Sequence, residues 1–312
     1  MNLTAFLHDI SPRTRFGIGV LILMISSICF STKAILIKLM YLHHVDTISV
    51  ITLRMFFSLP FYVIILFFLN RQERKNNAPP VAKSDILKIG LLGILSYYVS
   101  SMLDFWGLKY ISAGVERLIL FTYPTIVIIL SAIFFKKKIT TPQYLALLLT
   151  YFGVAITFLA ERGLGEQKNF AFGAMLIACC AFTYAFFVLF TSEVAKRVGS
   201  LQFTCYAMIG ATIPTLIQSI WYNGMDIFNF SSEIYGLTVW LVLVATLIPT
   251  FFLVEGIRVV GAANSSIIGF VGPVSTIFLA NIFLSERITV WQLVGTALVL
   301  LGISLVTRKG KA

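Results

Sequence analysis

Long apolar runs separated by short polar connectors make up nearly the whole chain. A helix of about 20 residues, rising about 1.5 Å per residue, crosses a hydrocarbon core of roughly 30 Å. Runs of this length predict ten membrane-spanning helices at residues 16–41, 46–69, 86–108, 112–135, 142–160, 171–194, 200–222, 234–256, 261–284 and 289–307. The pattern therefore predicts an all-α integral membrane protein.

Composition supports this prediction and narrows the function classes. The 312 residues are 58% hydrophobic and only 12% charged, against about 25% charged residues in soluble domains. Nearly all of this length is needed for spans and connectors, so no separate soluble catalytic domain is expected. The cysteines Cys29, Cys179, Cys180 and Cys205 lie within apolar runs without metal-site spacing, and we interpret them as packing residues. We expect no cofactor and no metal.

The distribution of Lys and Arg predicts the orientation. With ten spans both termini lie on one side, and that side holds 16 Lys and Arg residues against 5 on the other. Cytoplasmic connectors of membrane proteins are enriched in these residues, so we expect both termini in the cytoplasm, in a bacterial inner membrane. The net charge of +11 then reflects topology, and no nucleic-acid partner is expected.

The chain contains an internal repeat. Residues 109–157 align with residues 258–306 without a gap at a constant offset of 149, matching Pro124 with Pro273, Gln143 with Gln292 and an Ile-Thr pair with another. This divides the chain into two five-helix repeats, residues 1–160 and 170–308. Because five is odd, the second repeat is inverted in the membrane relative to the first, as in many secondary transporters.

Two stretches carry a family resemblance. They are "SAGVERLILFTYPTIVIILSAIFFKKKIT" and "GAANSSIIGFVGPVSTIFLANIFLSERITVWQLVGTALVLLGISLV". The second has a proline in mid-helix, a Glu-Arg-Ile-Thr turn and a Gly-containing final helix, and it resembles the EamA-like branch of the drug/metabolite transporter superfamily. Arg54 also stands where that family often has an arginine. The resemblance covers essentially the full chain and implies transport of amino acids, nucleotide-related compounds, nucleotide-linked sugars or drugs, often outward.

Ionisable residues within the spans are the main candidates for a site. A charge in hydrocarbon costs about 2.5 to 3.5 kcal/mol on insertion scales, so such residues usually face a cavity or a partner. Arg54 lies deep in the second span, which favours a cavity or a buried pair. Two explanations fit Lys33 equally well: its side chain snorkels to the membrane interface, or it lines a cavity. We expect the Asp104 carboxylate to pair with Arg54 or with Lys33.

We predict a polar cavity between the halves that binds a metabolite by its anionic group. The candidate substrate-binding residues are Arg54, Lys33, Asp104, Tyr98, Trp106, Tyr123, Tyr184, Asn264 and Ser266. Each aromatic residue taken alone also fits packing or an interfacial belt. Prolines within spans kink helices and free carbonyls that line cavities, and the candidates are Pro60, Pro124, Pro214, Pro249 and Pro273.

The sequence favours a secondary transporter, an exporter of small polar metabolites such as amino acids working by alternating access. The alternative within this class is an exchanger or importer of nucleotide-linked or methyl-donor metabolites. An intramembrane enzyme is disfavoured, because "LHHVD" (residues 42–46) offers the single cluster of His and acid residues and lacks further zinc ligands. A channel is also disfavoured. The expected partners are a small-molecule substrate and membrane lipid, with the protein a monomer or weak dimer.

Overall fold

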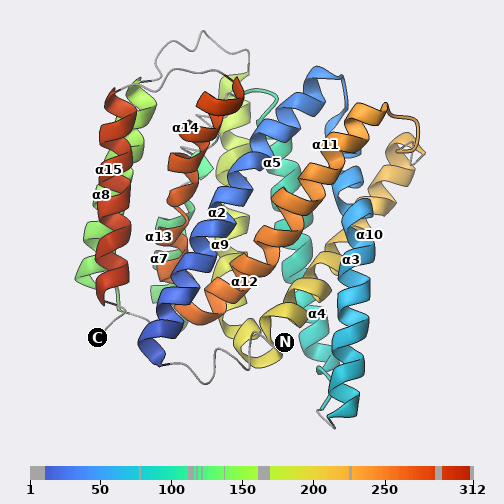
Figure 1. Ribbon diagram of the computed structural model, residues 1–312, viewed down its shortest axis with the longest axis horizontal. Coiled ribbons are helices and arrows are strands. Elements are labelled where there is room, and N and C mark those ends of the chain that lie inside the picture. The colour runs from blue at the N-terminus through green and yellow to red at the C-terminus, as the bar shows by residue number, and fades with distance from the viewer. Residues whose placement is uncertain are drawn as a thin grey trace.

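The computed structural model describes residues 11–76, 79–111, 116, 119–120, 122–136, 138–160, 169–224, 227–284 and 290–309, and at some helical positions it describes the backbone alone. The regular elements in these ranges are all helices (Figure 1). Six helical segments within them are long and apolar enough to cross a membrane: Arg13–Leu42, Thr47–Lys75, Lys83–Gly107, Ala171–Val198, Ser200–Tyr222 and Ser232–Val260.

The two halves of the chain contain corresponding elements. The first half contains α2 (Pro12–Leu42), α3 (Thr47–Lys75), α4 (Lys83–Gly93), η1 (Ile94–Ser100), α5 (Ser101–Gly107), α7 (Tyr123–Phe135) and α8 (Thr141–Ala160). The second half contains α9 (Phe170–Val198), α10 (Ser200–Asn223), α11 (Ser232–Val242), η2 (Leu243–Leu247), α12 (Ile248–Val260), α13 (Ala262–Ile268), α14 (Val271–Leu284) and α15 (Val290–Lys309).

The helices of the two halves are interleaved. In Figure 1, α8 and α15 run side by side at one edge, and α3 and α10 lie toward the other. Between them α2 packs along α12 and α14, and α9 packs along α5 and α7. We call these sets the α2 bundle (α2, α12 and α14) and the α9 bundle (α9, α5 and α7). Each bundle thus combines helices from both halves.

A π-helical segment interrupts the same helix in each half. The segments η1 and η2 begin at Ile94 and Leu243, at the offset of 149 that aligns the repeat. In η1 the hydroxyl of Ser100 donates to the carbonyl of residue 95 at 3.0 Å, and Thr246 makes the same bond to residue 241 at 2.8 Å. Pro249, the second residue of α12 after η2, has no N–H, which removes one α-helical hydrogen bond there. These features favour wider turns at matching positions.

Equivalent glycines allow close helix contacts in both bundles. A Cβ atom at Gly107 would lie 2.4 Å from Ile177 in the α9 bundle, and one at Gly256 would lie 2.3 Å from Leu23 in the α2 bundle. The glycines are again 149 positions apart, while Leu23 and Ile177 are 154 apart. The prolines Pro60 and Pro214, inside α3 and α10, share the offset of 154. Positions in the first two helices of each half therefore correspond at an offset of 154, and positions from the π-helical segments onward correspond at an offset of 149.

The segment 261–284, which the sequence predicts as one helix, is broken. α13 ends at Ile268 and α14 begins at Val271. Pro273 has no N–H to donate to the carbonyl of Gly269, which instead accepts from the N–H of Gly272 at 2.9 Å. Pro273 therefore lies in the first turn of α14, and Pro124 likewise lies at the start of α7. Both prolines begin helices instead of kinking them in mid-span.

The packing of α4 against α10 predicts a stability difference between two neighbouring glycines. A Cβ atom at Gly93 would lie 2.0 Å from the carbonyl oxygen of Ala207, whereas one at Gly90 meets nothing within 4 Å. We expect Gly93→Ala to destabilise the fold by about 1–3 kcal/mol, since α10 must move away. Gly90→Ala is the matched control and should leave the melting temperature equal or higher. Equal melting temperatures for the two variants in detergent would contradict this packing.

Candidate functional site

A cavity of about 120 Å³ lies between the α2 bundle and the α9 bundle. Its lining combines charged, hydroxyl and apolar groups: Leu23, Ser27, Phe30, Lys33, Arg54, Ser96, Tyr97, Ser100, Ser101, Asp104, Leu120, Tyr123, Cys180, Tyr184, Leu253, Ser265, Gly269 and Gly272.

Arg54 of α3 is held at this cavity by the π-helical segment η1. In a regular α-helix the N–H of Ser101 would donate to the carbonyl of Tyr97, but here it donates to the carbonyl of Tyr98. The Tyr97 carbonyl instead accepts from Nη2 of Arg54 at 3.1 Å, and the Ser101 hydroxyl accepts from the same nitrogen at 2.9 Å. The guanidinium also lies 5.2 Å from the centroid of the Phe105 ring.

Lys33 and Asp104 form a buried ion pair across the cavity. Nζ of Lys33 on α2 lies 2.5 Å from Oδ2 of Asp104 on α5, and the two side chains are 15% and 2% exposed. The ammonium also lies 5.6 Å from the centroid of the Phe105 ring, which Arg54 contacts too. The pair therefore joins the α2 bundle to the α9 bundle.

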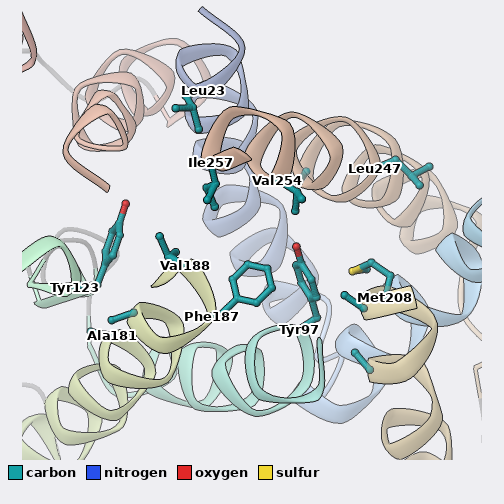
Figure 2. Close-up of a cluster of buried hydrophobic side chains, with 14 of the residues drawn as sticks. Leu23, Tyr97, Tyr123, Ala181, Phe187, Val188, Met208, Leu247, Val254 and Ile257 are labelled. Carbon is teal, nitrogen blue, oxygen red and sulfur yellow. The ribbon is translucent and has the colours of Figure 1, made fainter. Parts of the chain in front are cut away.

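The charges at the cavity favour an anionic ligand. Among the described residues, two cations and one carboxylate line it, and these leave a net positive charge at Arg54 when Lys33 and Asp104 are paired. Within the described ranges, Nε of Arg54 and the hydroxyl of Tyr97 are buried without a hydrogen-bond partner. Buried polar groups are almost always bonded, so these atoms are suited to contact a ligand. Figure 2 shows the Tyr97 hydroxyl directed from η1 toward Val254 of α12.

Two tyrosines link the aromatic wall of the cavity to the broken helix. Tyr123 at the start of α7 donates its hydroxyl to the carbonyl of Ser266 in α13 at 3.1 Å. Its ring packs edge-on against that of Tyr184, with centroids 5.1 Å apart. A Cβ atom at Gly269 would lie 2.4 Å from the Tyr123 hydroxyl. The turn at Gly269 thus makes room for the tyrosine.

The structure brings five of the nine predicted site residues together. Arg54, Lys33, Asp104, Tyr123 and Tyr184 line the cavity. The other four, Tyr98, Trp106, Asn264 and Ser266, lie outside its lining.

Tyr98 and Trp106 do not line the cavity, and Trp106 is 39% exposed. The Asn264 side chain instead accepts a hydrogen bond from Nε2 of Gln143 at 3.1 Å. Ser266 contributes its carbonyl to Tyr123, while its hydroxyl donates to residue 263 at 2.8 Å. Asn264 and Ser266 therefore bond to other helical residues instead of lining the cavity.

Sequence reasoning missed five polar or thiol residues of the lining, namely Ser27, Ser96, Ser100, Ser101 and Cys180. Three polar residues spaced four apart, Ser96, Ser100 and Asp104, were the available signal, because that spacing keeps side chains near one helix face. No comparable signal distinguishes Tyr97 from Tyr98, because the π-helical segment η1 decides which of the two lines the cavity.

The charged residues of the cavity have apolar counterparts in the second half. By the offsets of 154 for α2 and α3 and 149 for α5, Lys33 corresponds to Phe187, Arg54 to Met208 and Asp104 to Leu253. Phe187 packs on Tyr97 with ring centroids 5.2 Å apart, and Met208 lies on the other side of Tyr97 (Figure 2). The three charges that line the cavity in the described part of the chain therefore all come from the first half.

The "LHHVD" cluster has a structural role. Asp46 caps α3 by accepting from the N–H groups of Ile48 at 2.9 Å and Ser49 at 3.1 Å. Nε2 of His43 lies 3.4 Å from Oε1 of Glu233 at the start of α11. The part of the chain that the structure describes contains no group of three side chains able to hold a metal ion.

Comparisons with known proteins agree with this architecture. The EamA-like transporter family matches the chain twice, over residues 17–159 and 171–308. The chain is 29% identical over 283 residues to "Uncharacterized transporter YcbK" of Bacillus subtilis, covering 89% of this chain and 88% of that protein. A more distant relative is the "Probable terminal-alkyne amino-acid exporter" of Streptantibioticus cattleyicolor, 23% identical over 72% of this chain and 74% of that one.

A solved crystal structure shares the fold. It covers 95% of this chain with a TM-score of 0.72 at 14% sequence identity, and the match spans 98% of that chain. The apolar helices and the two family matches together make this a multi-pass membrane protein. The chain belongs to the EamA-like transporter family.

Proposed function

We propose that the protein is a secondary transporter that exports a small amino acid through the central cavity by alternating access. The observation that carries this proposal is the buried Arg54, which faces a cavity with a net positive charge. A guanidinium binds a carboxylate through charge-assisted hydrogen bonds. The relative named as an amino-acid exporter supports the same substrate class.

We further propose ten spans arranged as two inverted repeats, residues 1–160 and 170–308, with both termini in the cytoplasm of a bacterial inner membrane. The distribution of Lys and Arg supports the orientation. The matching π-helical segments and glycine contacts support the repeat. Since one chain forms the cavity, a monomer or weak dimer surrounded by lipid suffices for transport.

The size of the cavity favours a small solute over the alternative cargo. Pockets for drug-sized ligands are about 300–1,000 Å³, whereas this one measures about 120 Å³. A nucleotide-linked or methyl-donor metabolite would need a much larger opening than the described conformation offers. A small amino acid needs far less rearrangement.

Counterflow in proteoliposomes tests the proposal. Vesicles containing the purified protein and loaded with unlabelled L-alanine should accumulate external radiolabelled L-alanine transiently, while empty vesicles and protein-free vesicles should not. A panel of the other amino acids, each loaded inside, then ranks their exchange against labelled alanine. Lack of counterflow across the whole panel would contradict an amino-acid transporter.

A further inference from the structure

The hydroxyl of Tyr97 is a buried polar group at the cavity. Tyr97 is 6% exposed and lines the cavity, and among the residues that the structure describes its hydroxyl has no hydrogen-bond partner. An unpaired hydroxyl in such a place is unfavourable, because it loses the hydrogen bonds that it makes in water. The ring packs edge-on against that of Phe187, with centroids 5.2 Å apart. Packing therefore fixes the ring and leaves its polar atom without a bond.

Neighbouring hydroxyls of the same wall have protein partners. The Ser101 hydroxyl accepts from Nη2 of Arg54 at 2.9 Å, and the hydroxyls of Ser100 and Thr183 are bonded at 2.6 Å. Since buried polar groups are almost always bonded, an exception calls for an explanation. For Tyr97, which lines a cavity, a partner supplied by the ligand is such an explanation.

Arg54 and the Tyr97 hydroxyl face different parts of a ligand. Arg54 donates to the backbone carbonyl of Tyr97 at 3.1 Å, whereas the hydroxyl lies at the far end of the same residue, directed toward Val254 of α12 (Figure 2). The side chains labelled near it, Phe187, Met208 and Val254, are all apolar (Figure 2). A carboxylate bound at Arg54 therefore lies near the backbone of η1, and the hydroxyl is placed to meet the ligand's side chain.

We propose that Tyr97 determines the side-chain specificity of the carrier, and that the transported amino acid has a small uncharged side chain with a hydrogen-bonding group, as serine and threonine have. An apolar side chain of the same size would leave the Tyr97 hydroxyl unpaired. A charged side chain would find no opposite charge on Phe187, Met208 or Val254. The inference rests on the proposed function and names the substrate class within the amino acids.

Ligand binding to the purified protein in detergent tests this specificity with two matched pairs. L-Serine and L-2-aminobutyrate differ by a hydroxyl in place of a methyl group, and so do L-threonine and L-valine. The wild type should bind the hydroxyl-bearing member of each pair about tenfold or more tightly, because a site that bonds a substrate hydroxyl discriminates against an analogue lacking it. Equal affinity within the pairs, or binding of none of the four, would overturn the proposal.

Tyr97→Phe should abolish this preference while keeping the ring. The melting temperature without ligand should stay equal or rise, because the variant removes a buried unpaired group. A residue with a purely structural role would not combine a lost preference with undiminished stability. If the variant keeps the tenfold preference, or loses affinity for all four ligands equally, Tyr97 does not recognise the side chain.

Tyr62→Phe is the matched control. The Tyr62 side chain is also fully buried, but its hydroxyl is bonded to that of Thr250 at 2.8 Å, and it does not line the cavity. This variant should melt at a lower temperature, since Thr250 loses a partner, and should keep the hydroxyl preference. Loss of the preference in both variants would indicate a general change in packing and overturn the assignment to Tyr97.

Counterflow separates this inference from the proposed function. Amino-acid counterflow without a preference for the hydroxyl-bearing members leaves amino-acid transport standing and overturns the role of Tyr97. Lack of counterflow for every amino acid contradicts the proposed function itself.

Discussion

Replacing Arg54 with glutamine should weaken substrate affinity by about 30- to 1,000-fold, which corresponds to about 2–4 kcal/mol for a buried charge pair. Glutamine can still donate to the Tyr97 carbonyl, but it cannot pair with a carboxylate as a charge. The affinity is measured as the alanine concentration that half-saturates counterflow. Arg54→Lys should lose less, because it keeps the charge and gives up the planar donor geometry.

The matched control for this variant is Arg74→Gln. Arg74 lies in the last turn of the same helix, α3, and is exposed. Its replacement should leave affinity unchanged. Because Arg54 is buried and hydrogen-bonded, folding of Arg54→Gln is checked by gel filtration and melting temperature. A well-folded Arg54→Gln that transports alanine with wild-type affinity would refute a role for Arg54 in binding.

Filling the cavity should abolish transport. Ser27 lies on α2 and lines the cavity, and its hydroxyl makes none of the hydrogen bonds found among the described residues. Ser27→Phe places a ring into a space of about 120 Å³. We expect the initial rate of alanine counterflow to fall to about a tenth or less, because substrate and ring cannot share so small a volume.

The neighbouring position provides the control for this effect. Ile28 is 43% exposed on the same helix, at the surface expected to face lipid. Ile28→Phe should therefore transport at nearly the wild-type rate. Similar losses in the two variants would indicate a general perturbation of α2 instead of a blocked cavity.

The charged part of the site was predictable because charges are rare in apolar spans. Lys33, Arg54 and Asp104 each interrupt a long apolar run, and the cost of burying a charge in hydrocarbon requires a partner or a cavity. The expected pairing of Asp104 with a base is found with Lys33. Neutral polar residues were weaker indicators of the site, since the side chains of Asn264 and Ser266 make hydrogen bonds to other residues of the protein.

The local geometry was not predictable from periodicity. A π-helical turn shifts side chains relative to an α-helix, and η1 places Tyr97 instead of Tyr98 at the cavity. The break after α13 depends on Pro273 and on the space that Gly269 leaves for Tyr123. The apolar residues of that same segment, taken alone, predict one continuous span.

The most direct test of the central claim, that this cavity binds the transported amino acid, uses Cys180. This thiol lines the cavity, so a variant with alanine at Cys29, Cys179 and Cys205 reports on it alone. Saturating L-alanine should slow alkylation of Cys180 by a maleimide. A variant that keeps Cys179 alone, which is exposed on the same helix, should show no such protection. If alanine is transported while the Cys180 alkylation rate stays unchanged, the substrate binds elsewhere.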